Sequence, residues 1–207
     1  MHKLIVLPLL LYAAAVFAGA QVQEPLSPEV RLALQRAVGE SDSLRLAFAS
    51  PAEAEAWITE MSRRLQKHIP DDFIRVRFLK TLHYEATRAG LDPQLVLGVI
   101  QVESAFNKYA ISDAGARGYM QVMPFWIREI GNKGDDLFEM RTNLRFGCTI
   151  LRYYLDLEKG NLFRALGRYN GSLGQAWYPN RVVAAWRNAW AYPAASRTAQ
   201  AKADHPG

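Results

Sequence analysis

Apolar side chains recur every three or four residues along most of this chain, and this spacing constrains its fold more than any other feature. A stripe at that period covers one face of an α-helix, whereas a half-buried β-strand needs strict alternation. Ser50, Pro51 and Glu53 form a capping-box start for one such helix. There is no convincing alternating series, no glycine-rich phosphate loop and no internal repeat, so we expect a mainly α fold. The predicted helices span residues 28–38, 50–70, 71–90, 92–104, 124–130, 143–159, 161–169 and 178–190.

The first twenty residues have the composition of a secretory signal peptide. A short basic start precedes an apolar run over residues 4–17, and the small-x-small sequence at residues 18–20 is a cleavage site. The alternative is an uncleaved anchor, but the run is short for a bilayer and Pro8 interrupts it. We therefore predict that residues 1–20 are removed after Ala20. The remaining chain is then periplasmic and has no membrane anchor.

Charge and cysteine usage exclude several classes of function. The chain carries 25 Lys and Arg against 20 Asp and Glu, without a dense basic block, so nothing indicates nucleic-acid binding. The single cysteine, Cys148, shares an apolar stripe with Leu144 and Leu151, and we interpret it as a buried core thiol. His68 and His83 have no second His or Cys at metal-ligand spacing. We predict no metal site, no cofactor and a monomer.

One carboxylate stands at the end of an apolar helix face. Asp92 is a good N-cap and Pro93 fits the first helical position, so a helix can begin here. Glu103 lies on the extension of its apolar face, four residues after Val99 and three after Ile100. A lone Glu at a helix end is usually solvated. At this position, however, it is expected to point toward the interior or a cleft.

The residues after Glu103 form a long motif. A turn-rich segment with two glycines leads into Met-Gln-x-Met-Pro, and residues 101–124 read QVESAFNKYAISDAGARGYMQVMP. This segment resembles the catalytic segment of the lytic transglycosylases related to goose-type lysozyme. Only Tyr119 departs, because the family usually has Leu there. The matching positions are Glu103, Ser104, Phe106, Asn107, Ser112, Gly115, Ala116, Gly118, Met120, Gln121, Met123 and Pro124.

Two later segments extend the resemblance. The run from Ala165 to Gly171 is similar to the family's Ala-x-x-x-Tyr-Asn-Gly motif, and Tyr178 with Val182 is similar to its closing Tyr-x-x-x-Val pattern. In several relatives an acidic residue and a Thr precede the closing Tyr, but Gly174 and Gln175 stand there in this chain. A carboxylate contact to substrate at that place is therefore in doubt.

The resemblance implies a fold and a division of the chain. It implies a goose-type lysozyme-like helical domain with a cleft, which we assign to residues 91–192 as the lytic transglycosylase catalytic domain. Residues 21–90 are expected to form an N-terminal helical region. Residues 193–207 are expected to be a disordered tail.

The resemblance also implies a reaction. Such enzymes cleave the MurNAc–GlcNAc bond of peptidoglycan glycan strands without water and leave anhydromuramoyl ends. Glu103 is the implied acid and then base, since the substrate's acetamido group stabilises the positive centre and its C6 hydroxyl attacks. The sequence itself offers no compelling second acid. The nearest, Asp113, Asp135 and Asp136, fall in a variable position or a polar loop.

Seven further residues are candidates for substrate binding. Ser112 and Gln121 are expected to hydrogen-bond the acetamido group or sugar hydroxyls, Met123 to pack against a sugar ring, and Tyr178 to stack on a sugar face.

The other three have two roles open to each. Ser104 either bonds Glu103 or caps the helix end. Tyr169 orients either Glu103 or the acetamido group. Asn170 either holds its turn or contacts substrate.

Two other functions stay open at this point. One is a hydrolytic lysozyme of the same fold, in which a second carboxylate holds the attacking water. The other is a non-catalytic glycan-binding protein, against which the intact Glu103 argues. A secretion or cell-wall machinery is a compatible partner of a lytic transglycosylase.

Overall fold

The computed structural model describes residues 21–39 and 45–192 of this protein. The predicted mainly α class is confirmed, because the described residues form helices and only two isolated β-bridges. The predicted signal peptide and the predicted tail from residue 193 lie outside the described residues. The helices are α1 (Pro28–Gly39), α2 (Pro51–Leu65), α3 (Asp72–Arg88), α4 (Pro93–Ser104), α5 (Phe125–Ile130), α6 (Met140–Leu157), α7 (Leu162–Asn170), α8 (Trp177–Ala185) and the π-helical turn η1 (Trp186–Trp190).

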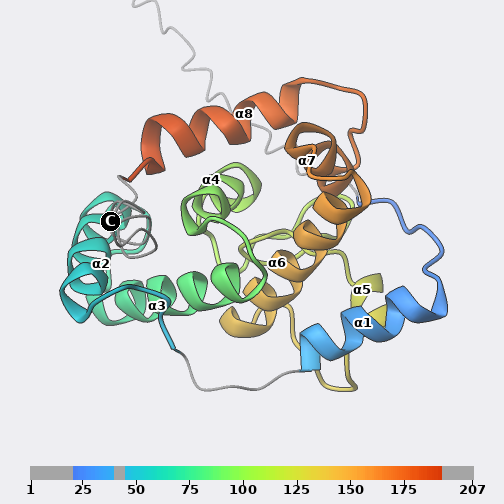
Figure 1. The fold of residues 1–207 in the computed structure, drawn as a ribbon, viewed down its shortest axis with the longest axis horizontal. Helices are drawn as coiled ribbons and strands as arrows, with labels where there is room; N and C mark the ends of the chain where they lie inside the picture. The colour runs from blue at the N-terminus through green and yellow to red at the C-terminus, as the bar shows by residue number, and fades with distance from the viewer. Residues whose placement is uncertain (1–20, 40–44, 193–207) are drawn as a thin grey trace, which may run out of the picture.

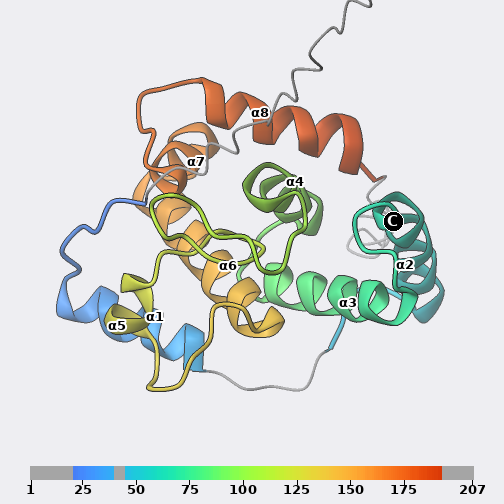
Figure 2. The ribbon, with the colours of Figure 1, turned by 180° about the vertical axis from the view of Figure 1, so that it is seen from behind.

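Helix α4 is the central element, with α8 on one side and α3 on the other (Figures 1 and 2). Its side chains Leu97, Val99 and Ile100 are completely buried, so this short apolar helix is enclosed by its neighbours. Gly98 permits the closest approach, because a Cβ added there would lie 3.0 Å from the backbone nitrogen of Trp186. The helix that carries Glu103 is therefore fixed on most of its circumference.

Local signals define both ends of α4. At its start the Asp92 carboxylate accepts a hydrogen bond from the Gln94 N–H at 2.7 Å. At its end Ala105 and Phe106 have φ values of 47° and 66°, in the left-handed region that is unfavourable for residues other than glycine. These two residues stop the helix directly after Ser104, one residue beyond Glu103, and turn the chain away.

Two predicted helix boundaries were wrong. Helix α6 begins at Met140 instead of Asn143, because the side chain of Glu139 accepts a hydrogen bond from the Thr142 N–H at 2.6 Å and caps the earlier turn. Helix α2 ends at Leu65 and does not reach Pro70, although Ser50 caps its start as predicted.

Helices α3 and α6 are joined by a buried ionic cluster. The carboxylate of Glu85 is fully buried and receives Arg88 at 3.0 Å, Arg141 at 3.3 Å and Arg145 at 3.2 Å. Because α3 packs on both α4 and α6, it belongs to the same core as they do. Cys148 of α6 is buried, as predicted from its stripe.

Candidate active site

Glu103 is buried at the last turn of α4, with 3% of its surface exposed. The hydroxyl of Tyr178, in the first turn of α8, donates a hydrogen bond to Glu103 Oε1 at 2.5 Å. Tyr178 is itself completely buried, so it presents only its hydroxyl to the carboxyl group. The contact joins two residues 75 positions apart.

Burial raises the pKa of Glu103 to about 8, because a charged carboxylate is poorly solvated there. The hydrogen bond from Tyr178 and the nearby amide of Asn170 oppose this rise. Across residues 21–39 and 45–192, no ion pair involves Glu103. The group therefore carries a proton at neutral pH, as a general acid must.

The carboxyl group borders a cavity of about 290 Å³ beside the loop that follows α4. Two large apolar side chains at this cavity, Tyr109 and Ile111, are 66% and 65% exposed. They could cover a sugar ring, and the sequence analysis did not identify them. The cavity is lined by Glu103, Ser104, Asn107, Tyr109, Ala110, Ile111, Ser112, Asp113 and Gln121.

Asn143 of α6 anchors this loop. Its Oδ1 accepts a hydrogen bond from the Met120 N–H at 2.8 Å, and its Nδ2 donates to the carbonyl of Arg117 at 2.8 Å. Gly118 packs so closely on Asn143 that a Cβ there would collide with the amide. From its sequence position, Asn143 was expected only to open a helix. The feature that could have revealed its second role is a polar amide on the buried side of α6.

Tyr169 and Ser104 hold the backbone of the same loop. The Tyr169 hydroxyl donates to the carbonyl oxygen of Met120 at 2.7 Å. The Ser104 hydroxyl lies 2.7 Å from the carbonyl oxygen of Tyr119 and 3.2 Å from that of Ile100. In this structure Tyr178, rather than either of them, is hydrogen-bonded to Glu103.

Ser112 and Gln121 face the cavity but are partly engaged within the loop. Ser112 Oγ accepts from the Ala116 N–H at 3.0 Å. Gln121 has a left-handed backbone, with φ of 48°, and its Nε2 donates to the carbonyls of Ala110 and Gly118 at 3.1 and 3.0 Å. Left-handed residues cluster at functional sites, where the surrounding structure compensates their strain.

Asn170 and Met123 are not among the residues that line the cavity. Asn170 is 2% exposed and its amide lies near Glu103, although neither of its side-chain polar atoms forms a hydrogen bond of ordinary geometry. Its turn is closed by the backbone instead, through the Gly171 N–H to the Arg168 carbonyl at 3.1 Å. Met123 is half-buried. The substrate contacts predicted for these residues remain predictions.

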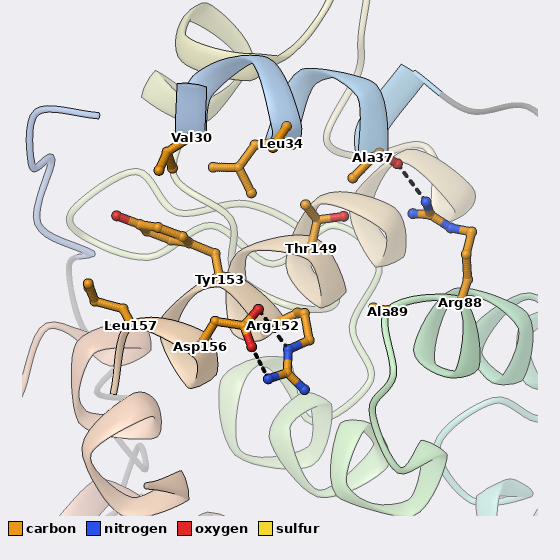
Figure 3. Close-up of a pocket in the computed structure, with 11 residues that line it drawn as sticks. Val30, Leu34, Ala37, Arg88, Ala89, Thr149, Arg152, Tyr153, Asp156 and Leu157 are labelled. Atoms are coloured by element: carbon orange, nitrogen blue, oxygen red, sulfur yellow. Dashed lines mark hydrogen bonds and ion pairs between the residues drawn. The ribbon is translucent and has the colours of Figure 1, made fainter. Parts of the chain in front are cut away.

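A larger cavity of about 490 Å³ lies between α1 and α6, and Figure 3 shows Val30, Leu34 and Tyr153 pointing into it. Its lining is mainly apolar, and Arg152 and Asp156 are paired with each other at its edge. Glu103 is not among its lining residues. We therefore place the candidate active site at Glu103.

In the ranges 21–39 and 45–192, no group of three or more His, Cys, Asp or Glu side chains could hold a metal ion. None of the helices placed by the structure is both long enough and apolar enough to cross a membrane.

Comparison with known proteins identifies relatives of this part of the chain. The family described as "Transglycosylase SLT domain" matches residues 80–187. The chain is 33% identical to a transglycosylase of Enterobacteria phage PRD1 over 115 residues, which are 52% of this chain and 42% of that protein. It is 43% identical over 65 residues to the membrane-bound lytic murein transglycosylase C of Haemophilus influenzae (strain PittEE), covering 31% of this chain and 16% of that protein.

A solved structure is also similar. It is an inactive glutamate-to-glutamine mutant of the lytic transglycosylase Slt from Pseudomonas aeruginosa, with 27% identity and a TM-score of 0.41. The likeness covers 64% of this chain and 22% of that one. This chain thus spans less than half the length of each of these relatives.

Proposed function

Because this chain belongs to the transglycosylase SLT domain family, we propose that it is a peptidoglycan lytic transglycosylase that uses Glu103 as its single acid and base. Membership of that family agrees with the goose-type lysozyme-like helical fold that the sequence motifs implied. The relatives named as lytic murein transglycosylases support the same class of substrate. The observation that carries the proposal is the buried carboxyl group of Glu103, which borders the cavity and accepts a hydrogen bond from Tyr178.

The first step needs a proton. Glu103, whose pKa is raised to about 8, donates its proton to the glycosidic oxygen as the C1–O bond breaks. The leaving sugar departs as a neutral alcohol. The acetamido group of the muramoyl residue then bonds to C1 and stabilises the positive charge that develops there.

In the second step the carboxylate acts as a base. It takes the proton of the C6 hydroxyl while the C6 oxygen attacks C1 and displaces the acetamido oxygen, which gives the anhydro sugar and restores the acid. The hydrogen bond from Tyr178 stabilises the carboxylate between the two steps. No water enters this scheme, and the burial of Glu103 suits it.

The loop after α4 would hold the glycan strand. The side chains of Asn143, Tyr169 and Ser104 each form a hydrogen bond with its backbone, so its polar groups are positioned before substrate arrives. Such preorganisation lowers the cost of reaching the reactive geometry. The exposed Tyr109 and Ile111 would offer an apolar surface for a sugar ring.

The proposed location is the periplasm, where peptidoglycan is found. It rests on the signal-peptide sequence at residues 1–20 and on the cleavage site at Ala20. A secretion or cell-wall machinery remains a compatible partner.

One observation favours hydrolysis as a second candidate function. Asp113, which sequence analysis placed in a variable position, lines the same cavity as Glu103. An exposed carboxylate there could hold and activate a water on the far side of the sugar, as in inverting glycosidases.

Product analysis separates these functions. Purified peptidoglycan would be digested with the wild type, Glu103→Gln and Asp113→Asn, and the fragments weighed by mass spectrometry. We expect anhydromuramoyl ends from the wild type and from Asp113→Asn, and a rate at least about a hundredfold lower from Glu103→Gln. Reducing ends that disappear in Asp113→Asn would establish hydrolysis. Binding without any product would establish a glycan-binding protein.

A further inference from the structure

The segment before α1 binds the chain two residues after Gln121, which lines the candidate site, although the two segments are far apart in sequence. Gln21 is 4% exposed, and its Oε1 accepts hydrogen bonds from the Trp126 indole N–H at 2.9 Å and the Met123 backbone N–H at 3.3 Å. More than a hundred residues separate Gln21 from both donors. One carbonyl oxygen thus joins the segment before α1 to the turn that opens α5.

The residues after Gln21 fasten the same segment to two helices. Gln23 Nε2 donates to Glu129 Oε1 of α5 at 2.8 Å, and Glu24 pairs with Arg168 of α7 at 2.8 Å. Figures 1 and 2 show this segment running from the side of α7 to the start of α1. We call residues 21–24 the N-terminal strap. Its outer contacts are exposed ion pairs and amides, whereas the Gln21 contact is buried.

We propose that Gln21 is a positioning residue for the reaction at Glu103, and this inference rests on the proposed function. The run from Met120 to Met123 ends the loop that follows α4, and it includes Gln121, which lines the cavity beside Glu103. Asn143 binds the Met120 N–H, Tyr169 binds the Met120 carbonyl, and Gln21 binds the Met123 N–H. Gln21 therefore supplies the last fixed point of this run.

The chemistry of the contact explains why a glutamine is needed. A buried N–H without an acceptor is unfavourable, and two of them, from Met123 and Trp126, converge on one oxygen. The Nε2 of Gln21 is buried near Tyr169 and forms no hydrogen bond of ordinary geometry, so the carbonyl half of the amide meets both donors. A carboxyl group of the same length supplies that oxygen even when it is protonated, whereas a thioether of the same length does not.

The strap lies outside the part of the chain that the family model matches. The family match spans residues 80–187, and Gln21 lies well outside it. Under the proposed export Gln21 directly follows the cleavage site, so the first residue of the mature chain would be the one that binds Met123 and Trp126.

The experiment compares Gln21→Met with Gln21→Glu, and uses Gln23→Met as the matched control on the same strap. The protein is purified as the cell leaves it, and its first residue is identified by mass spectrometry. We measure kcat and KM on purified glycan strands, the Tm, and the ¹H–¹⁵N resonance of the Trp126 indole, assigned with Trp126→Phe. A positioning role predicts that Gln21→Met lowers kcat about tenfold with little change in KM.

The remaining outcomes decide the inference. Gln21→Glu should keep kcat within about threefold of the wild type and Gln23→Met should leave it unchanged, because each retains the buried acceptor. An unchanged kcat in Gln21→Met, or equal losses in Gln21→Met and Gln23→Met that follow the Tm, would overturn it. If the wild type releases no fragments, the proposed function fails instead. The Trp126 indole resonance then still tests the contact, because it should move in Gln21→Met and stay in Gln23→Met.

Discussion

Glu85 and Glu103 are both buried glutamates, on adjacent helices of one core, but their surroundings differ in charge. Arg88, Arg141 and Arg145 surround the Glu85 carboxylate and join α3 to α6. Glu103 instead has the uncharged hydroxyl of Tyr178 and the wall of a cavity. Burial alone therefore does not give the two carboxyl groups the same role. Glu85 joins two helices through three arginines, whereas the partner of Glu103 is neutral and burial raises the pKa of Glu103 to about 8.

The largest expected effect on stability is at Glu85. Glu85→Gln leaves three guanidinium groups without their shared counter-charge, and removal of one partner from a buried ion pair costs about 3–5 kcal/mol of unfolding free energy. Urea unfolding measures this loss. The exposed Glu55→Gln is the control and should stay within about 0.5 kcal/mol. A stable Glu85→Gln would remove the contrast between the two glutamates.

The next prediction concerns the pH dependence of stability at Glu103. Its pKa is about 8 in the folded protein and has the ordinary value of 4.5 in the unfolded chain. The folded state therefore binds the proton more tightly, and its stability falls as the pH rises from 4.5 to 8. Glu103→Gln should lack this component, worth a few kcal/mol, and should be the more stable protein at pH 8. Urea unfolding at several pH values measures this difference. If the unfolding free energies of the two proteins change in parallel between pH 4.5 and 8, the prediction is wrong.

Tyr178→Phe tests the neutral partner itself. The hydroxyl of Tyr178 lowers the pKa of Glu103 against the effect of burial, so its removal should raise that pKa further. The alkaline limb of the kcat profile should then move to higher pH, and kcat should fall about tenfold because the carboxylate loses a hydrogen bond. Tyr153→Phe, at the remote cavity, is the control. An unmoved alkaline limb would show that this bond does not tune Glu103.

The smallest effect is expected at Ser104, which adjoins Glu103 in sequence but binds the loop backbone. Ser104→Ala should cost about 1 kcal/mol of unfolding free energy and leave the kcat profile at its original pH. Ser172→Ala is a matched control, because its hydroxyl is equally buried and has no hydrogen-bond partner. A shifted pH profile in Ser104→Ala would place this hydroxyl in the chemistry at Glu103.

Much of the site could be predicted from the sequence, because the signals that define α4 are local. Asp92 caps its start, apolar spacing sets its buried face, and Glu103 follows on that face. The motifs around Glu103, Tyr169 and Tyr178 indicated the family, whose match includes all three. Each of these signals depends on residues a few positions apart, or on a pattern of residue types.

Only the tertiary structure decided the partners of these residues. It showed that Tyr178, and not Tyr169, is hydrogen-bonded to Glu103. It also showed that Asn143 and Gln21 accept hydrogen bonds from the backbone of the loop that follows α4. The physical reason is the distance along the chain. Hydrogen bonds between residues 23 to 105 positions apart depend on how whole helices pack, and helical spacing carries no information about which helices become neighbours.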